Sequence, residues 1–251
     1  MSKSDEIAVE QATVHCFRNN DRNYGRRRIA AELASDGIYI TEYKVSCILK
    51  KNNLVAKGGR DPKKRKSPKP TKEQYLAEML IPNETYAAMA NGLWHSDISE
   101  LKCYHSRVYV CAILDFATRR IVGFSISKKQ MQDIVRDAFM MAVGRNPNRP
   151  EGAIFHSDRG CQYTAKRTKE MIEKHGFRIS MSRPGTPNDN QPIESFWKTL
   201  KQELPDISKL DFDKAAGVIT HYIEMYYNSE RRHSGIDYMT PNEKFTVLSV
   251  Q

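Results

Sequence analysis

The amino-acid sequence predicts an α/β fold: a mixed five-stranded sheet with helices on its faces, preceded by a small all-α domain. Between residues 93 and 204, three strand-like segments are followed by helical and strand-like segments in alternation. Such an order is typical of a sheet that helices cover on its faces. Upstream, residues 23–54 show helical patterns only, and a basic segment containing proline and glycine separates the two regions.

Residues 1–56 are predicted to form a helix-turn-helix domain. Ile29 and Leu33 recur at helical spacing in a first segment, and Gly37 suits the end of that helix. Thr41 can cap a second helix, in which apolar residues again follow at helical spacing. Two short helices joined by a short turn are typical of a DNA-binding motif, although two helices of an ordinary bundle give the same pattern.

Positive charge is concentrated near the N-terminus. The chain has a formal net charge of +10, and residues 1–72 hold 17 Lys and Arg against 8 Asp and Glu. A basic segment of this kind attracts polyanions, above all a phosphate backbone. Residues 57–90 are predicted to be a basic linker that proline and like charges keep extended. The cations expected to contact DNA in these two regions are Arg26, Arg27, Arg28, Lys50, Lys51, Lys63, Lys64, Arg65 and Lys66.

Residues 91–205 are predicted to form the α/β core, and residues 206–251 a helical extension of that core. β-Branched and apolar runs predict five strands, at residues 93–104, 107–114, 121–127, 153–155 and 178–182. Apolar residues at helical spacing predict three helices, at residues 131–143, 165–175 and 192–204.

Composition excludes several classes of protein. Hydrophobic residues make up 39% of the chain and charged residues 28%, as in a soluble globular protein. No apolar run is long enough to cross a bilayer, and the N-terminus lacks the apolar stretch of a signal peptide. We therefore expect no membrane partner and a cytoplasmic location. The five cysteines are scattered without a CxxC pair, which argues against a disulfide framework and a zinc ribbon.

Three acidic residues carry the strongest functional signal. Asp97 lies in the motif WHSDIS of the first predicted strand, Asp158 in FHSDRG after the fourth, and Glu194 in DNQPIESFW on the last core helix. Two aspartates and a glutamate from separate elements can hold a pair of divalent cations, the arrangement used for in-line displacement at phosphorus. Each residue alone is weak evidence, because most acidic side chains are solvated, so the prediction depends on all three together.

The ordered triple, with its flanking residues, resembles the DDE catalytic core of transposases and retroviral integrases. The order of elements is similar to that of ribonuclease-H-like folds, which place the first Asp on the central strand and the Glu on the last helix. From Asn23 to Phe245 the chain resembles the second-frame (OrfB) transposases of bacterial insertion sequences, including the ending YYNSERRHS. Ser99, Cys161 and the Gln191-Pro192 pair depart from the common pattern, but none of them replaces an acidic residue.

The resemblance implies a transposase that nicks DNA at insertion-sequence ends and joins the exposed 3′-OH to another strand. It implies two Mg²⁺ ions per site, with Mn²⁺ as a substitute; Asp97 bridges both ions, while Asp158 and Glu194 each complete one. The implied partners are double-stranded DNA from element ends and targets, an upstream-frame OrfA segment that is fused or separate, and further copies of the chain. The implied location is the bacterial cytoplasm, at the nucleoid.

Two other functions stay open from the sequence. One is a non-catalytic DNA-binding regulator with a silent integrase-like core, although the intact acidic residues argue against it. The other is a stand-alone ribonuclease of the same fold. The basic N-terminal region and the Arg-Arg-His cluster of the tail favour DNA ends over RNA–DNA hybrids as the substrate.

Further candidates for DNA contacts lie beside the site and in the tail: Asn190, Lys198, Lys201, Arg231, Arg232 and His233. The two lysines share a helix face with Glu194, and Lys198 alternatively pairs with that carboxylate. For Asn190 the alternative is a helix cap. For Arg231 and His233 the alternative is that they fold back on the core.

Four other residues are weighed between packing and function. Asp115 is interpreted as a side chain that caps a turn rather than a metal ligand. His156 is interpreted as strand-end packing. For Gln162 and Tyr163 the sequence leaves contact with DNA and capping of the next helix equally open.

Overall fold

The computed structural model describes residues 3–57, 84–182 and 187–249. The chain divides into two compact units, one made of Met1–Ser67 with Arg232–Met239 and the other of Pro68–Arg231 with Thr240–Gln251. The basic linker residues Lys63, Lys64, Arg65 and Lys66 lie outside the described residues.

The first unit is a small helical domain of three helices, α1 (Lys3–Asn19), α2 (Arg26–Ser35) and α3 (Glu42–Lys51). The two predicted helices are confirmed with their caps: the Thr41 side chain accepts a hydrogen bond from the backbone nitrogen of Lys44, and Gly37 follows α2 with a φ of +79°. Helix α1 was not predicted. Its buried face contains Thr13, Cys16 and Phe17 rather than a stripe of large apolar residues, so its periodicity is weak.

A short segment near the C-terminus completes this unit. The backbone nitrogen of Arg232 donates to the hydroxyl of Tyr24 at 3.0 Å, and the Arg232 guanidinium pairs with Glu32 and donates to Ser35. We predicted residues 206–251 as an extension of the core. In the structure, residues 232–239 of that range belong to the helical unit instead.

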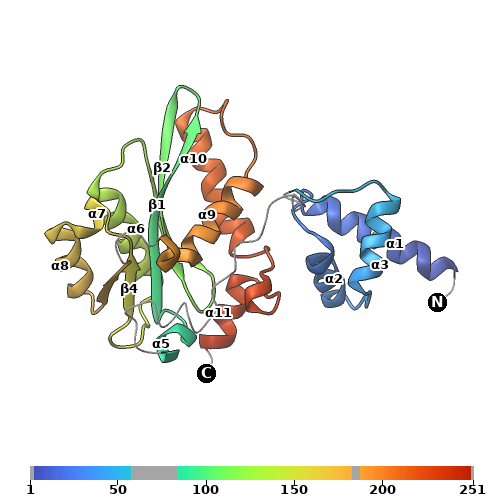
Figure 1. Ribbon diagram of the computed structural model, residues 1–251, viewed down its shortest axis with the longest axis horizontal. Coiled ribbons are helices and arrows are strands. Elements are labelled where there is room, and N and C mark those ends of the chain that lie inside the picture. Colours follow the sequence, from blue (N-terminus) through green and yellow to red (C-terminus); the bar gives the residue numbers. More distant parts are fainter. Residues whose placement is uncertain (1–2, 58–83, 183–186, 250–251) are drawn as a thin grey trace. The chain divides into compact units, whose positions relative to one another are not determined.

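The second unit contains one five-stranded sheet in the order β3-β2-β1-β4-β5 (Figure 1). Strands β2 and β3 run antiparallel to their neighbours, while β4 and β5 continue the sheet in parallel from β1. The predicted mixed sheet is therefore confirmed, with the first strand at its centre. The strand bounds are β1 Leu93–Cys103, β2 Ser106–Asp115, β3 Ile121–Ser127, β4 Ile154–Ser157 and β5 Arg178–Met181.

Helices pack on both faces of this sheet, and strand alternation divides the core accordingly. In β2, Val108, Val110, Ala112 and Leu114 belong to one hydrophobic cluster, and Cys111 and Ile113 to the other. The first cluster includes α9 (Gln191–Glu203), α10 (Phe212–His221) and the π-helical turn Tyr222–Tyr227. The second includes α6 (Gln132–Arg145), α7 (Cys161–Thr164) and α8 (Lys166–Lys174).

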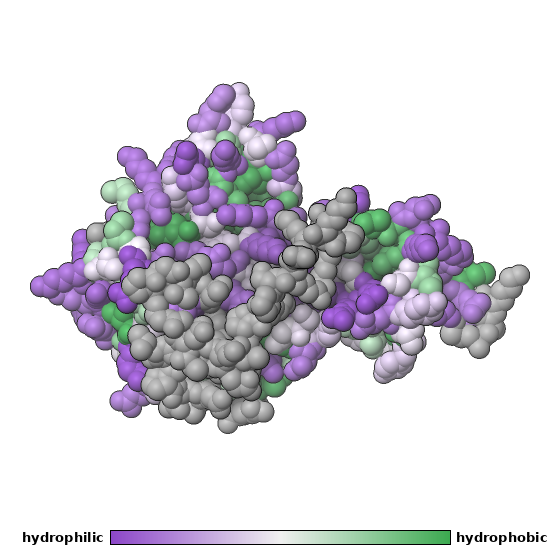
Figure 2. Space-filling model, in the orientation of Figure 1, coloured by the Kyte–Doolittle hydropathy of each residue, from purple (hydrophilic) through white to green (hydrophobic). Residues whose placement is uncertain are grey.

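Smaller elements complete the unit: α5 Glu84–Ala88, the 3-10 turn Pro187–Asn190 and α11 Pro241–Ser249, while the 3-10 turn Ser234–Ile236 belongs to the first unit. On the face shown in Figure 2, hydrophilic residues cover most of the described surface of the second unit, with small hydrophobic areas between them. No helix within the described ranges is both long and apolar enough to cross a membrane. All five cysteines are unbonded.

Candidate active site

Asp97 and Asp158 lie side by side because β1 and β4 pair in parallel. Ser96 is opposite Ser157 in this register, so the next residue of each chain segment is an aspartate at the same level of the sheet. Adjacent strands are about 4.8 Å apart. The sheet thus brings together two acidic residues that are far apart in the sequence, at the carboxyl end of β4.

Glu194 lies in the first turn of α9, and a neighbour on that helix bonds to Asp97. The indole Nε1 of Trp197 donates a hydrogen bond to Oδ2 of Asp97, with a separation of 2.9 Å. Trp197 follows Glu194 by three residues, which is less than one helical turn. This bond therefore holds the beginning of α9, and Glu194 with it, beside the central strand.

Asn190, which directly precedes α9, makes a second connection to β1. Its Nδ2 donates to the carbonyl oxygen of Ser96 at 3.0 Å, and its Oδ1 lies 2.9 Å from Nδ1 of His95. We expected either a DNA contact or a helix cap. The side chain is only 4% exposed and forms no capping hydrogen bond, so the structure gives Asn190 a different role, that of an anchor between α9 and β1.

Asp158 and Glu194 lie close enough to Asp97 to affect its ionisation. Burial, together with the negative charges of Asp158 and Glu194, raises the pKa of Asp97 to about 7. Hydrogen bonds from the backbone of Ile98 and from Trp197 oppose this shift. The protein's own interactions therefore do not offset the free-energy cost of ionising Asp97.

The chemistry of this group fits a divalent cation. In the parts of the chain that the structure describes, no Lys, Arg or His side chain forms an ion pair with Asp97, Asp158 or Glu194. An oxygen-only donor set with unbalanced negative charge suits Mg²⁺ or Mn²⁺. Among the same described residues, no three Asp, Glu, His or Cys side chains are close enough to ligate one ion. The carboxylates must therefore approach one another to hold a metal.

The turn after Asp158 is tight because Gly160 leaves space for it. The backbone nitrogen of Gly160 donates to Oδ1 of Asp158 at 2.9 Å, and a Cβ at position 160 would lie 3.0 Å from that same oxygen.

Tyr163, one helical turn further, is buried, and its hydroxyl lies 2.9 Å from Oγ of Ser96. Tyr163 therefore supports the strand that carries Asp97, a role that neither of the two alternatives weighed from the sequence included.

Two histidines lie in the strands that precede the aspartates. Nδ1 and Nε2 of His156 lie 2.9 and 3.2 Å from the hydroxyls of Ser180 and Ser182, in agreement with the predicted packing role. The rings of His95 and His156 are 5.1 Å apart. Burial lowers the pKa of His156 to about 4 and lowers that of His95 well below its usual value, so both side chains are neutral at physiological pH.

Asp115 has the structural role that the sequence predicted. Its Oδ2 accepts hydrogen bonds from the backbone nitrogen and hydroxyl of Thr118 at 3.1 and 2.6 Å, and its Oδ1 accepts one from the backbone nitrogen of Asn91. Its Oδ2 therefore serves the turn between β2 and β3, and its Oδ1 holds the segment that precedes β1.

The cations predicted near the site have different surroundings. Lys198 and Lys201 are exposed on α9, the helix that carries Glu194. Arg231 is buried, and its guanidinium forms two hydrogen bonds of 2.8 Å with the carboxylate of Glu203. Of the two alternatives for Arg231, the structure therefore agrees with folding back on the core rather than with a DNA contact, because its charge is already neutralised inside the core.

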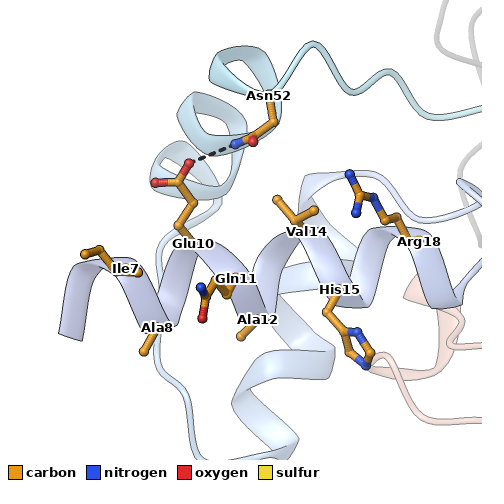
Figure 3. Close-up of a pocket in the computed structure, with 9 residues that line it drawn as sticks. All are labelled: Ile7, Ala8, Glu10, Gln11, Ala12, Val14, His15, Arg18 and Asn52. Carbon is orange, nitrogen blue, oxygen red and sulfur yellow. Dashed lines mark hydrogen bonds between the residues drawn. The ribbon is translucent and has the colours of Figure 1, made fainter. Parts of the chain in front are cut away.

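In the helical unit, the predicted DNA-contact residues form exposed ion pairs. The Nε atoms of Arg26 and Arg27 both lie 3.4 Å from Oε2 of Glu42. Lys51 pairs with Glu10 of α1 at 2.7 Å, and Glu10 also accepts a hydrogen bond from Asn52, as Figure 3 shows beside an open hollow on α1. Exposed pairs of this kind contribute little to stability, so a phosphate group can replace the carboxylate.

The remaining basic candidates are partly covered. Arg28 donates to the carbonyl oxygen of Asn23 and lies over the ring of Tyr24. Arg232 forms an ion pair with Glu32, and His233 is half-buried. Lys50, by contrast, is exposed. Among the predicted DNA-contact residues, those on the exposed surfaces of α3 and α9 are therefore best placed to contact another molecule.

Comparison with known proteins identifies the family. Models of the integrase core domain match residues 87–187 and residues 175–241. The solved structure of a simian T-cell lymphotropic virus intasome in complex with PP2A regulatory subunit B56 gamma is similar, with a TM-score of 0.51 at 15% identity over 93% of this chain and 73% of that chain. This likeness agrees with the ribonuclease-H-like fold.

Curated relatives match almost the whole chain. The transposase for insertion sequence element IS904 of Lactococcus lactis is 36% identical over 231 residues, which is 90% of this chain and 89% of the relative. Transposase InsF for insertion sequence IS3A of Escherichia coli is 30% identical over 93% of this chain and 83% of its own length. The protein therefore belongs to the OrfB-type transposases of bacterial insertion sequences, which carry an integrase-like core.

Proposed function

We propose that the protein nicks one DNA strand at each insertion-sequence end and then joins the exposed 3′-OH to another phosphodiester. The observation that carries this proposal is the gathering of Asp97, Asp158 and Glu194 from the central strand, its parallel neighbour and α9, with no described cation paired to them. Divalent metal ions held by these three carboxylates would activate the attacking oxygen and stabilise the leaving oxygen.

The residues divide this work by position. Asp97 interacts electrostatically with both of the other carboxylates, so we assign it as the residue that would contact both of two metal ions, with Asp158 and Glu194 completing one site each. Lys198 and Lys201 follow Glu194 on α9 and are exposed, so we assign them to the phosphates of the DNA strand that is cut. Mg²⁺ is the expected ion and Mn²⁺ its substitute.

The upstream-frame OrfA segment and further copies of the chain are proposed partners on DNA, because two element ends have to be joined in one assembly. The bacterial cytoplasm, at the nucleoid, is the corresponding location. These proposals follow from the family rather than from a contact in the structure.

The test is a strand-transfer assay with labelled duplexes from the element ends, Mg²⁺ and the OrfA segment. Glu194→Gln is expected to lower the amount of joined product at least about a thousandfold. DNA binding should persist, because the substitution changes only one carboxylate oxygen to an amide nitrogen. Glu100→Gln is the matched control: Glu100 lies on β1 near Asp97 but pairs with Arg107, so activity should not change. DNA binding without nicking or joining by the wild type would favour the alternative, a regulator with a silent core.

We further propose that the exposed face of α3 enters a groove of the DNA. Tyr43, Cys47 and Lys50 follow one another at helical spacing and are all exposed, and Tyr39 in the preceding turn is 87% exposed. The second helix of a helix-turn-helix reads bases in this way, and the neighbouring arginines supply phosphate contacts.

Tyr43→Ala is accordingly expected to weaken binding to an element-end duplex about tenfold, the typical effect of one lost base contact. Fluorescence anisotropy measures the affinity at a fixed salt concentration. Ile7→Ala, which removes an exposed apolar side chain from α1, is the control and should bind as the wild type does. Equal affinities of the two variants would rule out α3 as the reading face.

A further inference from the structure

Trp197 combines a packing role with a polar contact to the proposed site. The side chain is 3% exposed and belongs to the hydrophobic cluster between α9 and the sheet, with its ring 4.8 Å from that of Phe196. Its single donor, the indole N–H, points to Oδ2 of Asp97 at 2.9 Å. A purely apolar position in this cluster would need no such donor.

The contact restricts the carboxylate of Asp97. An ionised carboxylate has about four acceptor positions on two oxygens, and the indole occupies one of them. The backbone of Ile98 also hydrogen-bonds to this carboxylate. Together the two bonds restrict its rotation and leave the remaining acceptor positions for other partners. Because Trp197 and Glu194 share one turn of α9, the same helix sets the position of Glu194 and the orientation of Asp97.

We propose that Trp197 is a positioning residue, whose indole N–H holds Asp97 in the orientation that ligates divalent metal ions. This inference rests on the proposed function, since it concerns the same site. Groups that hydrogen-bond to metal ligands typically change metal affinity or activity by 10- to 100-fold. Trp197 is thus expected to act through Asp97 without touching DNA or metal itself.

The chain offers a matched control, because it contains two tryptophans. Trp94 is fully buried and donates its indole N–H to Oδ1 of Asn91 at 3.3 Å, not to an acidic residue. Trp94→Phe and Trp197→Phe each remove one indole, one side-chain hydrogen bond and a similar volume. Only the second change removes a hydrogen bond to a proposed metal ligand.

The experiment is calorimetric titration of the full chain with Mn²⁺, on the wild type, Trp197→Phe, Trp94→Phe and Asp97→Asn. We expect about tenfold weaker Mn²⁺ binding in Trp197→Phe and wild-type affinity in Trp94→Phe. Mn²⁺ binding that Asp97→Asn abolishes, but that Trp197→Phe leaves unchanged or tightens, would overturn the inference while the proposed function stands. If Asp97→Asn binds Mn²⁺ as the wild type does, the proposed metal site itself fails, and the inference fails with it.

A second measurement keeps the inference testable if Trp197→Phe does not fold. In Trp94→Phe, Trp197 is the remaining tryptophan, and its emission should be quenched by Mn²⁺ because the indole bonds to a metal ligand. The quenching should be absent from the double variant that also carries Asp97→Asn. Saturation with Mn²⁺ without any change in Trp197 emission would refute the assigned role.

Discussion

Asp97→Asn is expected to abolish strand joining and, without metal, to stabilise the protein above pH 7. Burial and the neighbouring carboxylates raise the pKa of Asp97 from an ordinary 3.8 to about 7. Because the folded state holds this proton more tightly than the unfolded state, the group's contribution to stability is fully present below about pH 4. It is lost as the pH rises through about 7. Asparagine carries no charge, keeps an acceptor for Trp197, and so avoids this loss.

The expected gain in the free energy of unfolding is on the order of 3 kcal/mol at pH 8, because each pKa unit corresponds to about 1.4 kcal/mol and partial exposure reduces the total. Thermal unfolding in EDTA between pH 4 and pH 8.5 measures it. The gap between variant and wild type should widen with pH, while Glu100→Gln should follow the wild type. Added Mg²⁺ should stabilise the wild type at pH 8 and leave Asp97→Asn unchanged. Parallel pH curves for variant and wild type would contradict this account.

Arg231→Met is expected to lower the free energy of unfolding by about 3–5 kcal/mol, because it leaves a buried carboxylate without its partner. The Glu203 carboxylate is buried and accepts hydrogen bonds from Arg231 and from the hydroxyl of Tyr222. Glu203 is the last residue of α9, so the damage should also reach the helix that carries Glu194.

Urea unfolding with and without the substitution measures this effect. Arg145→Met is the matched control: Arg145 pairs with Glu224 at 2.6 Å, but the pair is exposed and should contribute less than about 1 kcal/mol. Adding Glu203→Leu to Arg231→Met should recover most of the loss, since a buried pair replaced by apolar groups is often neutral. If Arg231→Met lowers the free energy of unfolding no more than Arg145→Met does, the buried pair does not make the contribution expected here.

The sequence predicted the core elements well because their signals are local. The β-branched and apolar run in residues 107–114 and the helical spacing in 131–143 depend on residues a few positions apart, and both elements formed close to the predicted bounds. Helix α1 was missed because its buried face is partly polar, so tertiary contacts rather than periodicity define it.

Side-chain partners were less predictable, because they come from distant parts of the chain. Nothing near Asn190 indicates that its amide bonds to Ser96, and nothing near Arg231 indicates Glu203. A basic residue in a basic tail has the same local pattern whether it meets a phosphate or a buried carboxylate. For Trp197, by contrast, a signal was present: its spacing of three residues from Glu194 placed it near the acidic residues.

The return of residues 232–239 to the helical unit has a consequence for the gene. Arg231 and Thr240 belong to the second unit, so the coding sequence of the first unit is interrupted by that of the second. A single recombination event within the codons of the linker would exchange Met1–Ser67 but leave behind the segment that contacts Tyr24 and Glu32. Replacing the helical unit intact therefore requires recombination breakpoints both in the codons of the linker and around the codons of residues 232–239. The two ends of the gene are accordingly expected to be inherited together.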